Sequence, residues 1–276
     1  MLAYVYWDVD PVLLHLGPLE IRYYGLLFAT GFVIGYYLLR YMYKNEGAPL
    51  EEIDKMSLYV ILGSVIGARL GHVLFYEPIY YLENPGEILA VWHGGLASHG
   101  GAIGLAVGLW LYGRRSWNKS ELYVMDRIAI LTPLAGSLIR LGNLFNSEIY
   151  GHETSLPWGF IFVRNGDTFP SHPTQIYEAA GYLLIFFILW LIYRKLNGQI
   201  PRGYLVGWTL ILIFTLRFFV EFVKNVQVPW ELKMLHIIGL NMGQLLSIPF
   251  IALGIYLIYR SKKLGLPPAA KTQPKK

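Results

Sequence analysis

The stretch from Leu122 to Gly151 reads LYVMDRIAILTPLAGSLIRLGNLFNSEIYG. Its apolar part, Leu122–Ile139, runs directly into a polar part that begins at Arg140 and holds amides and a carboxylate. The apolar part is close to the roughly 20 residues that an α-helix needs to cross a bilayer. Polar side chains at membrane depth are costly, which makes them candidates for function. The stretch therefore predicts a membrane-spanning helix that ends in a functional site.

Six further apolar blocks of similar length occur along the chain, and polar residues lie between the blocks rather than on amphipathic faces. Only 15% of the residues are charged, whereas a soluble domain has about 25%. We therefore predict an all-α polytopic membrane protein with about seven transmembrane helices. The blocks run about Arg22–Tyr43, Met56–Phe75, Ile88–Tyr112, Leu122–Ile139, Ile176–Tyr193, Gly203–Val223 and Met242–Tyr259.

Lys and Arg cluster in alternate connections and in the C-terminal tail, while the other connections hold only Arg164, Lys224 and Lys233. Because Lys and Arg favour the cytoplasmic side, the N-terminus is expected outside and the C-terminus inside. Seven spans fit this arrangement, because an odd number of spans places the two termini on opposite sides of the membrane. The N-terminus lacks the basic region of a signal peptide. We expect a single integral membrane domain over 1–264, with a small periplasmic head segment at about 144–172. Residues 265–276 are expected to form a disordered basic cytoplasmic tail.

Three arginines, Arg69, Arg140 and Arg217, are predicted to lie inside the spans, at a total insertion cost of roughly 8–10 kcal/mol. Partners, water or a bound anion must offset that cost. Arg217 and Glu221 are spaced i, i+4, so an internal ion pair is as well supported as a functional role. The glycines around Arg69 repeat every fourth residue, which predicts close helix packing but does not account for the arginine.

The polar run itself suggests a lipid headgroup site. If it is helical, Arg140, Asn143 and Ser147 share one face. Arginine suits phosphate oxygens as a planar fork, and Asn amides suit glycerol hydroxyls or carbonyls. A single Asn could instead hold helices together. On the next span, Gln175 and Glu178 share a face.

A glycine-rich loop with two histidines, Trp92–Gly101, precedes another apolar helix. Such a loop exposes backbone N–H groups to an anion, and a histidine suits proton transfer. The alternative is a re-entrant turn whose glycines, with Gly100, Gly104 and Gly108, serve packing. His93 and His99 share no helical face, so no metal is expected. The absence of cysteine excludes disulfides and thiolate chemistry by the chain itself.

Several motifs in the sequence resemble those of a known protein family. The run RLGNLFNSEIYG is similar to the signature of the prolipoprotein diacylglyceryl transferase family. Further blocks that resemble the family occur from the first span to the sixth: IRYYG, GARLGHVLFY, HGGLASHGG, HPTQIYE and LRFFVEF. Together with RLGNLFNSEIYG they are six motifs in the family's order, which makes the match specific, and GQLLSIP at the last span fits too. The segment between Gly151 and His172 is shorter than in some members, which carry a longer outer head there.

The resemblance implies transfer of a diacylglyceryl group from phosphatidylglycerol to the lipobox cysteine of a prolipoprotein signal peptide, with release of glycerol 1-phosphate. It places the protein in the bacterial cytoplasmic membrane with its active site toward the periplasm. The partners are these two substrates and the bilayer; no cofactor and no nucleic acid are expected. The residues expected to be catalytic are Tyr24, His99, Arg140 and Arg217. Those expected to bind phosphatidylglycerol are Arg69, Arg140, Asn143, Asn146, Glu148, Gly151, Gln175 and Glu221.

Two other functional classes remain open on the residues alone. A transporter needs polar groups at both ends of its pathway, and only Asp126 and Arg127 supply them at the inner end. A non-catalytic lipid-binding protein would need the arginines but not the His99 loop. The sequence leaves open whether His99, Glu148 or Glu221 takes the thiol proton.

Overall fold

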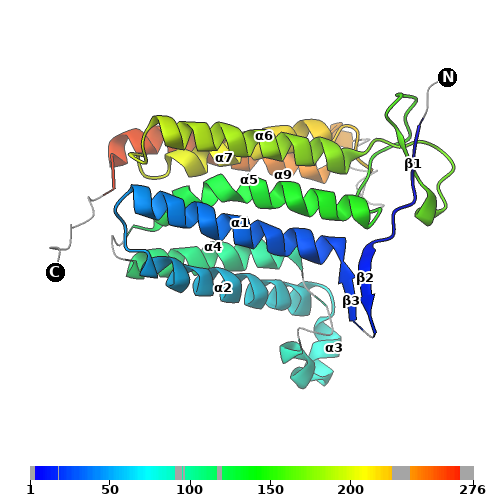
Figure 1. Cartoon of the computed structure of the whole chain (residues 1–276), viewed down its shortest axis with the longest axis horizontal. Helices are drawn as coiled ribbons and strands as arrows, with labels where there is room; N and C mark the ends of the chain where they lie inside the picture. The colour runs from blue at the N-terminus through cyan, green and yellow to red at the C-terminus, as the bar shows by residue number, and fades with distance from the viewer. Residues whose placement is uncertain are drawn as a thin grey trace. The chain divides into compact units, whose positions relative to one another are not determined.

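The structure is a computed structural model that describes residues 4–17, 19–90, 95, 97–116, 120–225 and 237–267. The described part of the chain is mostly helical (Figure 1). In chain order the elements are β1 (Val5–Trp7), β2 (Val12–Leu16), β3 (Leu19–Arg22), α1 (Tyr23–Asn45), α2 (Glu51–Phe75), α3 (Pro78–Glu83), the 3-10 helix η1 (Pro85–Leu89), α4 (Ser98–Arg115), α5 (Glu121–Phe145), β4 (Phe160–Phe162), the 3-10 helix η3 (Val163–Asn165), α6 (Thr174–Lys195), α7 (Tyr204–Val220) and α9 (Met242–Leu264).

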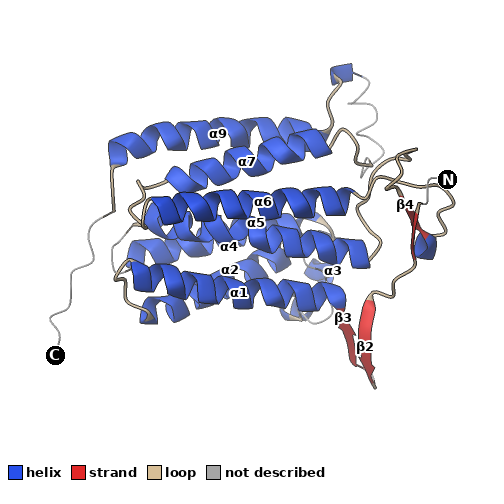
Figure 2. Ribbon diagram, turned by 45° about the horizontal axis from the view of Figure 1, so that its top comes forward, coloured by secondary structure: helices blue, strands red, loops and turns tan. Residues whose placement is uncertain are grey.

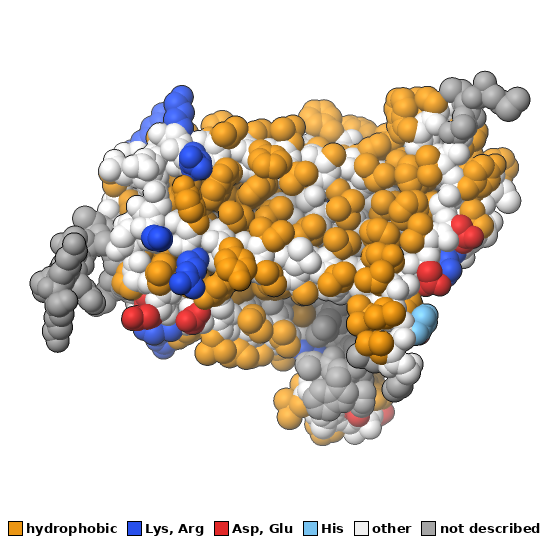
Figure 3. Space-filling model, viewed as in Figure 1, with side chains coloured by type: hydrophobic (Ala, Val, Ile, Leu, Met, Phe, Trp, Pro, Cys, Tyr) orange, Lys and Arg blue, Asp and Glu red, His pale blue; other side chains and the backbone are white. Residues whose placement is uncertain are grey.

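Among the described residues, five helices are long and apolar enough to cross a membrane: α1, α2, α5, α6 and α9. The helix α7 is apolar but shorter, at 17 residues. Large apolar side chains are exposed along α2 at helical spacing, among them Leu58, Leu62 and Ile66. Hydrophobic side chains cover much of the face in view in Figure 3. A soluble monomer rarely exposes so much apolar surface, and the chain is accordingly a helical membrane protein.

Contacts within the chain divide it into two compact units: Met1–Leu38 with Ile128–Gly265, and Leu39–Arg127 with Leu266–Lys276. In the first unit, α7 packs against both α6 and α9 (Figure 2). The contact between α7 and α9 is close, because a Cβ added to Gly207 would lie 2.8 Å from the carbonyl oxygen of Gly254. The single domain over 1–264 stays a prediction.

Short strands, which the sequence did not predict, also belong to the first unit. β1 pairs with β4 in parallel, and β2 with β3 forms an antiparallel hairpin (Figure 2). β1 and β4 come from distant parts of the sequence, and three residues each are too short for an alternating pattern to mark them. β4 and η3 lie within the predicted head segment at about 144–172. The pairing of these strands satisfies backbone N–H and C=O groups in the segments that lie outside the long helices.

In the second unit, two glycine stripes bring α2 and α4 into backbone contact (Figure 1). A Cβ added to Gly67 would lie 2.4 Å from the carbonyl oxygen of Gly100, and one added to Gly104 would lie 2.0 Å from that of Gly63. The predicted packing role of both stripes is confirmed, since no larger residue fits these positions at this helix spacing.

Two predicted block boundaries differ most from the helices in the structure. The third apolar block was expected to begin at Ile88, but α4 begins at Ser98. Gly95 has a φ of +69°, a left-handed conformation that a helix cannot contain. The fourth block was expected to end at Ile139, whereas α5 continues to Phe145 and carries Arg140 with it. The predicted tail lies outside the described residues from residue 268 onward.

Candidate functional site

The polar run that follows the apolar part of α5 begins inside the helix and continues beyond it. Arg140 and Asn143 lie on the last turns of α5, one helical turn apart. The expected face with Ser147 was wrong, because the helix ends at Phe145 and Ser147 has a φ of +53°. The chain folds back here: the Glu148 backbone N–H donates to the carbonyl oxygen of Asn143 at 3.0 Å.

Hydrogen bonds tie five of the predicted site residues together around Glu148. The Asn143 amide donates to Glu148 Oε1 at 2.7 Å, and the Asn146 amide donates to the same oxygen at 3.2 Å. Arg140 Nη1 donates to Asn143 Oδ1 at 3.1 Å. Gln175, fully buried on α6, donates to the backbone carbonyl of Glu148 at 2.7 Å. Glu148 thus orients both amides and, through Asn143, the guanidinium.

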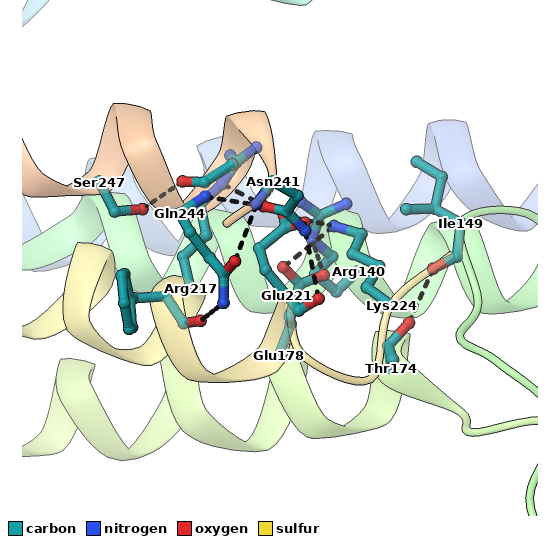
Figure 4. A network of polar contacts seen from close by, with 12 residues as sticks. Arg140, Ile149, Thr174, Glu178, Arg217, Glu221, Lys224, Asn241, Gln244 and Ser247 are labelled. Carbon is teal, nitrogen blue, oxygen red and sulfur yellow. Dashed lines mark hydrogen bonds and ion pairs between the residues drawn. The ribbon is translucent and has the colours of Figure 1, made fainter. Parts of the chain in front are cut away.

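An ion-pair network joins this cluster to α7 (Figure 4). Arg140 Nε lies 2.8 Å from Glu178 Oε2, and the other oxygen of Glu178 lies 3.4 Å from Lys224 Nζ. Lys224 Nζ also lies 3.6 Å from Glu221 Oε1. Glu221 in turn pairs with Arg217 Nε at 3.6 Å, which confirms the internal ion pair predicted from their spacing. The two arginines are therefore connected through two carboxylates and one lysine.

The members of this ion-pair network differ in exposure. The side chain of Glu178 is fully buried and that of Lys224 is 5% exposed, whereas those of Arg140 and Arg217 are 16% and 34% exposed. Burial is the largest influence on Lys224 and lowers the pKa of its ammonium group, while Glu178 raises that pKa. The arginines are thus the members that an anion can reach, and the buried groups form their support.

The start of α9 holds Glu221 from the other side. The Asn241 amide donates to Glu221 Oε2 at 3.1 Å, and the same residue caps α9 in a reciprocal capping box with Gln244. A Cβ added to Gly243 would lie 2.5 Å from the Glu221 carboxyl carbon. Glu221 is consequently fixed by α9, by Lys224 and by Arg217 at once.

Tyr24 lies beside the polar run, at the start of α1. A Cβ added to Gly142 would lie 2.7 Å from a ring carbon of Tyr24. The neighbouring Tyr23 stacks on Phe145, with ring centroids 4.2 Å apart. The two tyrosines therefore attach the first turn of α1 to the end of α5.

Gly151 occupies a position with no room for a side chain. A Cβ there would lie 2.1 Å from the carbonyl oxygen of Val223, 2.8 Å from Thr174 Cγ2 and 2.9 Å from His172 Cβ. Its backbone N–H donates to the carbonyl oxygen of His172 at 2.9 Å, and it pairs as an isolated bridge with Lys224. Gly151 therefore lets three segments meet at the edge of the cluster.

We expect Gly151→Ala to destabilise the protein by about 1–3 kcal/mol, the usual cost of overpacking a filled site. The backbone must move to admit the methyl group, and the segment that leads to Lys224 moves with it. Thermal unfolding of the purified variant measures the loss. Gly86→Ala is the control, because a Cβ at Gly86 meets nothing within 4 Å. Equal melting temperatures for the two variants would contradict the close approach at Gly151.

Arg69 and His99 belong to the second unit. Arg69 is 4% exposed, and its guanidinium donates to the backbone carbonyls of Glu87, Ile88, Ala90 and Gly95. These bonds favour a structural task for Arg69, and its substrate contact stays a prediction. His99 is the second residue of α4; its side chain lies outside the described residues, as does His93.

Three residues of the site were missed by sequence reasoning. Glu178 was placed on the correct face of its span but not in the site, and Lys224 was counted as a loop charge. Asn241 lies before the predicted block and went unnoticed. The spacing of Glu221 and Lys224, i and i+3, was the available signal, because it places both side chains on one side of a helical turn.

The arrangement is suited to an anionic ligand that also carries hydroxyl groups. Two partly exposed guanidinium groups supply several N–H donors for phosphate oxygens. The carboxylate of Glu148 and the amides of Asn143 and Asn146 supply acceptors and donors beside them. Across the ranges that the structure describes, no group of three or more His, Asp or Glu side chains has a geometry that would hold a metal ion.

The chain is similar to known proteins of one family over most of its length. The family model described as prolipoprotein diacylglyceryl transferase matches residues 11–260. A phosphatidylglycerol–prolipoprotein diacylglyceryl transferase from Porphyromonas gingivalis is 48% identical over 95% of this chain and 96% of its own length. Proteins with the same name from Tolumonas auensis and Bacteroides fragilis are 46% and 42% identical, each over 94% of this chain and 98% and 96% of their own lengths.

Proposed function

The chain belongs to the prolipoprotein diacylglyceryl transferase family, and from that premise we infer that it catalyses the reaction for which its relatives are named. It is a transferase that moves the diacylglyceryl group of phosphatidylglycerol to a prolipoprotein. The observation that carries this function is the family match, which spans every predicted site residue from Tyr24 to Glu221.

The reaction is a displacement at carbon. The sulfur of the lipobox cysteine attacks the terminal glyceryl carbon of the diacylglyceryl group, and a carbon–sulfur bond forms as the carbon–oxygen bond to phosphate breaks. The electron pair of the broken bond leaves on glycerol 1-phosphate, and the thiol proton goes to a base. The chain has no cysteine, and direct transfer between the two substrates needs no nucleophile from the enzyme.

Arg140 and Arg217 bind the phosphate of phosphatidylglycerol and stabilise the charge that grows on it as the carbon–oxygen bond breaks. Their ion pairs with Glu178 and Glu221 support this role, because they fix both guanidinium groups before the lipid arrives. Asn143, Asn146 and Glu148 bind the glycerol hydroxyls of the headgroup. Their mutual hydrogen bonds leave lone pairs and N–H groups for that purpose.

The proposal gives roles to five further residues. His99 takes the proton from the thiol, because an imidazole titrates near neutral pH and a thiol is mostly protonated there. Tyr24 lies beside the polar run and contacts the reacting phosphate region. Gln175 holds the Glu148 backbone, and Gly151 admits the lipid close to the main chain. Arg69 is an accessory contact for the same lipid.

We place the protein in the bacterial cytoplasmic membrane with seven spans, the N-terminus and the head segment at about 144–172 in the periplasm, and the tail in the cytoplasm. The alternation of basic connections supports this orientation. Two helices beyond the five long apolar ones, α4 and α7, complete the seven spans. Both substrates are amphipathic, so the site opens sideways to the bilayer.

Single cysteines introduced into this cysteine-free chain test the orientation. We expect Thr168→Cys in the head segment to react with a membrane-impermeant thiol reagent in intact spheroplasts. Lys263→Cys, at the end of α9, should react only after the membrane is opened. Labelling of the two positions in the opposite order would overturn the proposed topology.

The alternative functions are not favoured by these observations. The inner-end cation that suggested a transport pathway, Arg127, is fully buried and pairs with Glu46 at 2.6 Å. Its guanidinium also lies 3.8 Å from the ring centroid of Tyr123. An arginine enclosed in this way serves packing within its own unit rather than a path for solutes.

Release of the headgroup tests the proposed function. The purified protein in vesicles with glycerol-labelled phosphatidylglycerol should release labelled glycerol phosphate when a lipobox peptide is added. A peptide with serine in place of the cysteine is the control and should release none. Release that is independent of the thiol would mean hydrolysis, and no release with either peptide would refute the transfer reaction.

A further inference from the structure

Lys224 is a buried cation that the proposed reaction does not use. Its side chain is 5% exposed, and no step of the displacement requires an amine there. Burying a lysine is costly unless it is paired, and this lysine lies between two carboxylates, Glu178 and Glu221. Each of these carboxylates holds one of the two arginines proposed to bind phosphate.

We propose that Lys224 is a positioning residue for the transfer reaction: it links Glu178 to Glu221 and thereby sets the distance and direction of the Arg140 and Arg217 guanidinium groups. This inference rests on the proposed function, because it gives the two arginines a shared phosphate. Lys224 itself does not touch the lipid. It acts through the two carboxylates with which it pairs (Figure 4).

The charge balance of the network supports this role. Three cations and two carboxylates are connected by ion pairs, so this network carries one net positive charge, which is available to the phosphate and to the neighbouring Glu148 carboxylate. Without Lys224 the arginines and carboxylates would balance, and no positive charge would remain. Each carboxylate would also lose its second cation and attract its arginine more strongly, away from the lipid.

The chain geometry also supports it. Lys224 follows Glu221 by three residues, so their side chains leave the same side of the turn after α7. Its backbone pairs with Gly151, next to the Glu148 cluster. The residue therefore connects, through its main chain and its side chain, the segments that carry both arginines.

We expect Lys224→Met to lower kcat by about 10- to 100-fold. The upper value is the loss of rate that a displacement of a catalytic group by about 1 Å can cause. KM for phosphatidylglycerol should rise as well, because the net positive charge is lost. Lys224→Arg keeps the charge and both ion pairs and should restore kcat to near the parent value. The assay measures transfer of labelled diacylglyceryl from phosphatidylglycerol vesicles to a lipobox peptide, per mole of folded protein.

Lys55→Met is the matched control. Lys55 also pairs with a glutamate three residues away, Glu52 at 2.7 Å, but its side chain is 65% exposed. This variant should keep the parent kcat. Transfer by neither the parent nor Lys55→Met would refute the proposed function, whereas full kcat in Lys224→Met with an active parent would refute the positioning role alone.

A double variant separates positioning from stability if Lys224→Met folds poorly. Lys224→Met with Glu178→Gln removes one buried charge of each sign, so fewer unpaired charges remain and the folded yield should recover. Its kcat should nevertheless stay low, because Arg140 has lost the carboxylate that aligns it. Recovery of kcat together with the folded yield would show that Lys224 serves stability only, and would overturn the proposal.

Discussion

Arg140→Lys is expected to lower kcat by about 10²–10³, the usual loss when one group that stabilises transition-state charge is removed. Arg140 makes two directed contacts at once, through Nε to Glu178 and through Nη1 to Asn143. A lysine ammonium keeps the charge but cannot hold both partners and still present a planar fork to phosphate. The measurement is initial rate of transfer at saturating phosphatidylglycerol, with Arg140→Ala beside it.

The control for this substitution is Arg164→Lys. Arg164 is also ion-paired, with Asp10 at 2.8 Å, but its side chain is 42% exposed and its ion-pair partners, Asp8 and Asp10, lie outside the network of Arg140. It should retain the parent rate, and the melting temperature of each variant shows whether the fold is intact. Near-normal rates in both Arg140→Lys and Arg140→Ala would mean that Arg140 does not bind the phosphate.

His99→Gln is expected to lower turnover by about 10²–10⁴, the range for loss of a general base. Binding of phosphatidylglycerol should change little, because the phosphate contacts come from the arginines. His93→Gln, six residues earlier, should have a much smaller effect. Turnover and lipid binding are measured on the same preparations.

The pH dependence distinguishes a base from a structural histidine. A cysteine thiol has a pKa of about 8.5, so its thiolate fraction rises with pH up to that value. His99→Gln should therefore gain more rate than the parent as the pH is raised, because only the variant lacks a base. Equal gains in both would assign thiol ionisation to the arginines, and an unchanged rate in His99→Gln at neutral pH would exclude the base role.

The sequence predicted the helical membrane fold well, because a run of about 20 mainly apolar residues identifies a membrane-spanning helix by its composition alone. It also predicted the cluster around Glu148, since Arg140, Asn143, Asn146 and Glu148 follow one another within one short run. Contacts inside a run are local, and helical spacing is enough to foresee most of them. The prediction that Ser147 shares the face of Arg140 and Asn143 was wrong, because no neighbouring residue indicates that the helix ends before Ser147 or that Ser147 has a left-handed φ.

The support behind the arginines could not be predicted in the same way. Glu178, Lys224 and Asn241 come from three separate stretches, and they meet only because α6, α7 and α9 pack together. A lysine after a span predicts a loop charge as readily as a buried partner, since both follow an apolar block. The short strands β1 and β4 were missed for a similar reason: their pairing joins residues far apart in the sequence.

The central claim is that the phosphate departs with the glycerol while the diacylglyceryl group goes to sulfur. Phosphatidylglycerol labelled with tritium in the acyl chains and with radioactive phosphorus in the headgroup tests it in one reaction with a lipobox peptide. The account predicts all of the transferred tritium on the peptide, and an equal molar amount of phosphorus as water-soluble glycerol phosphate. Both isotopes on the peptide, or tritium released as free fatty acid, would contradict it, because a different bond would have been broken.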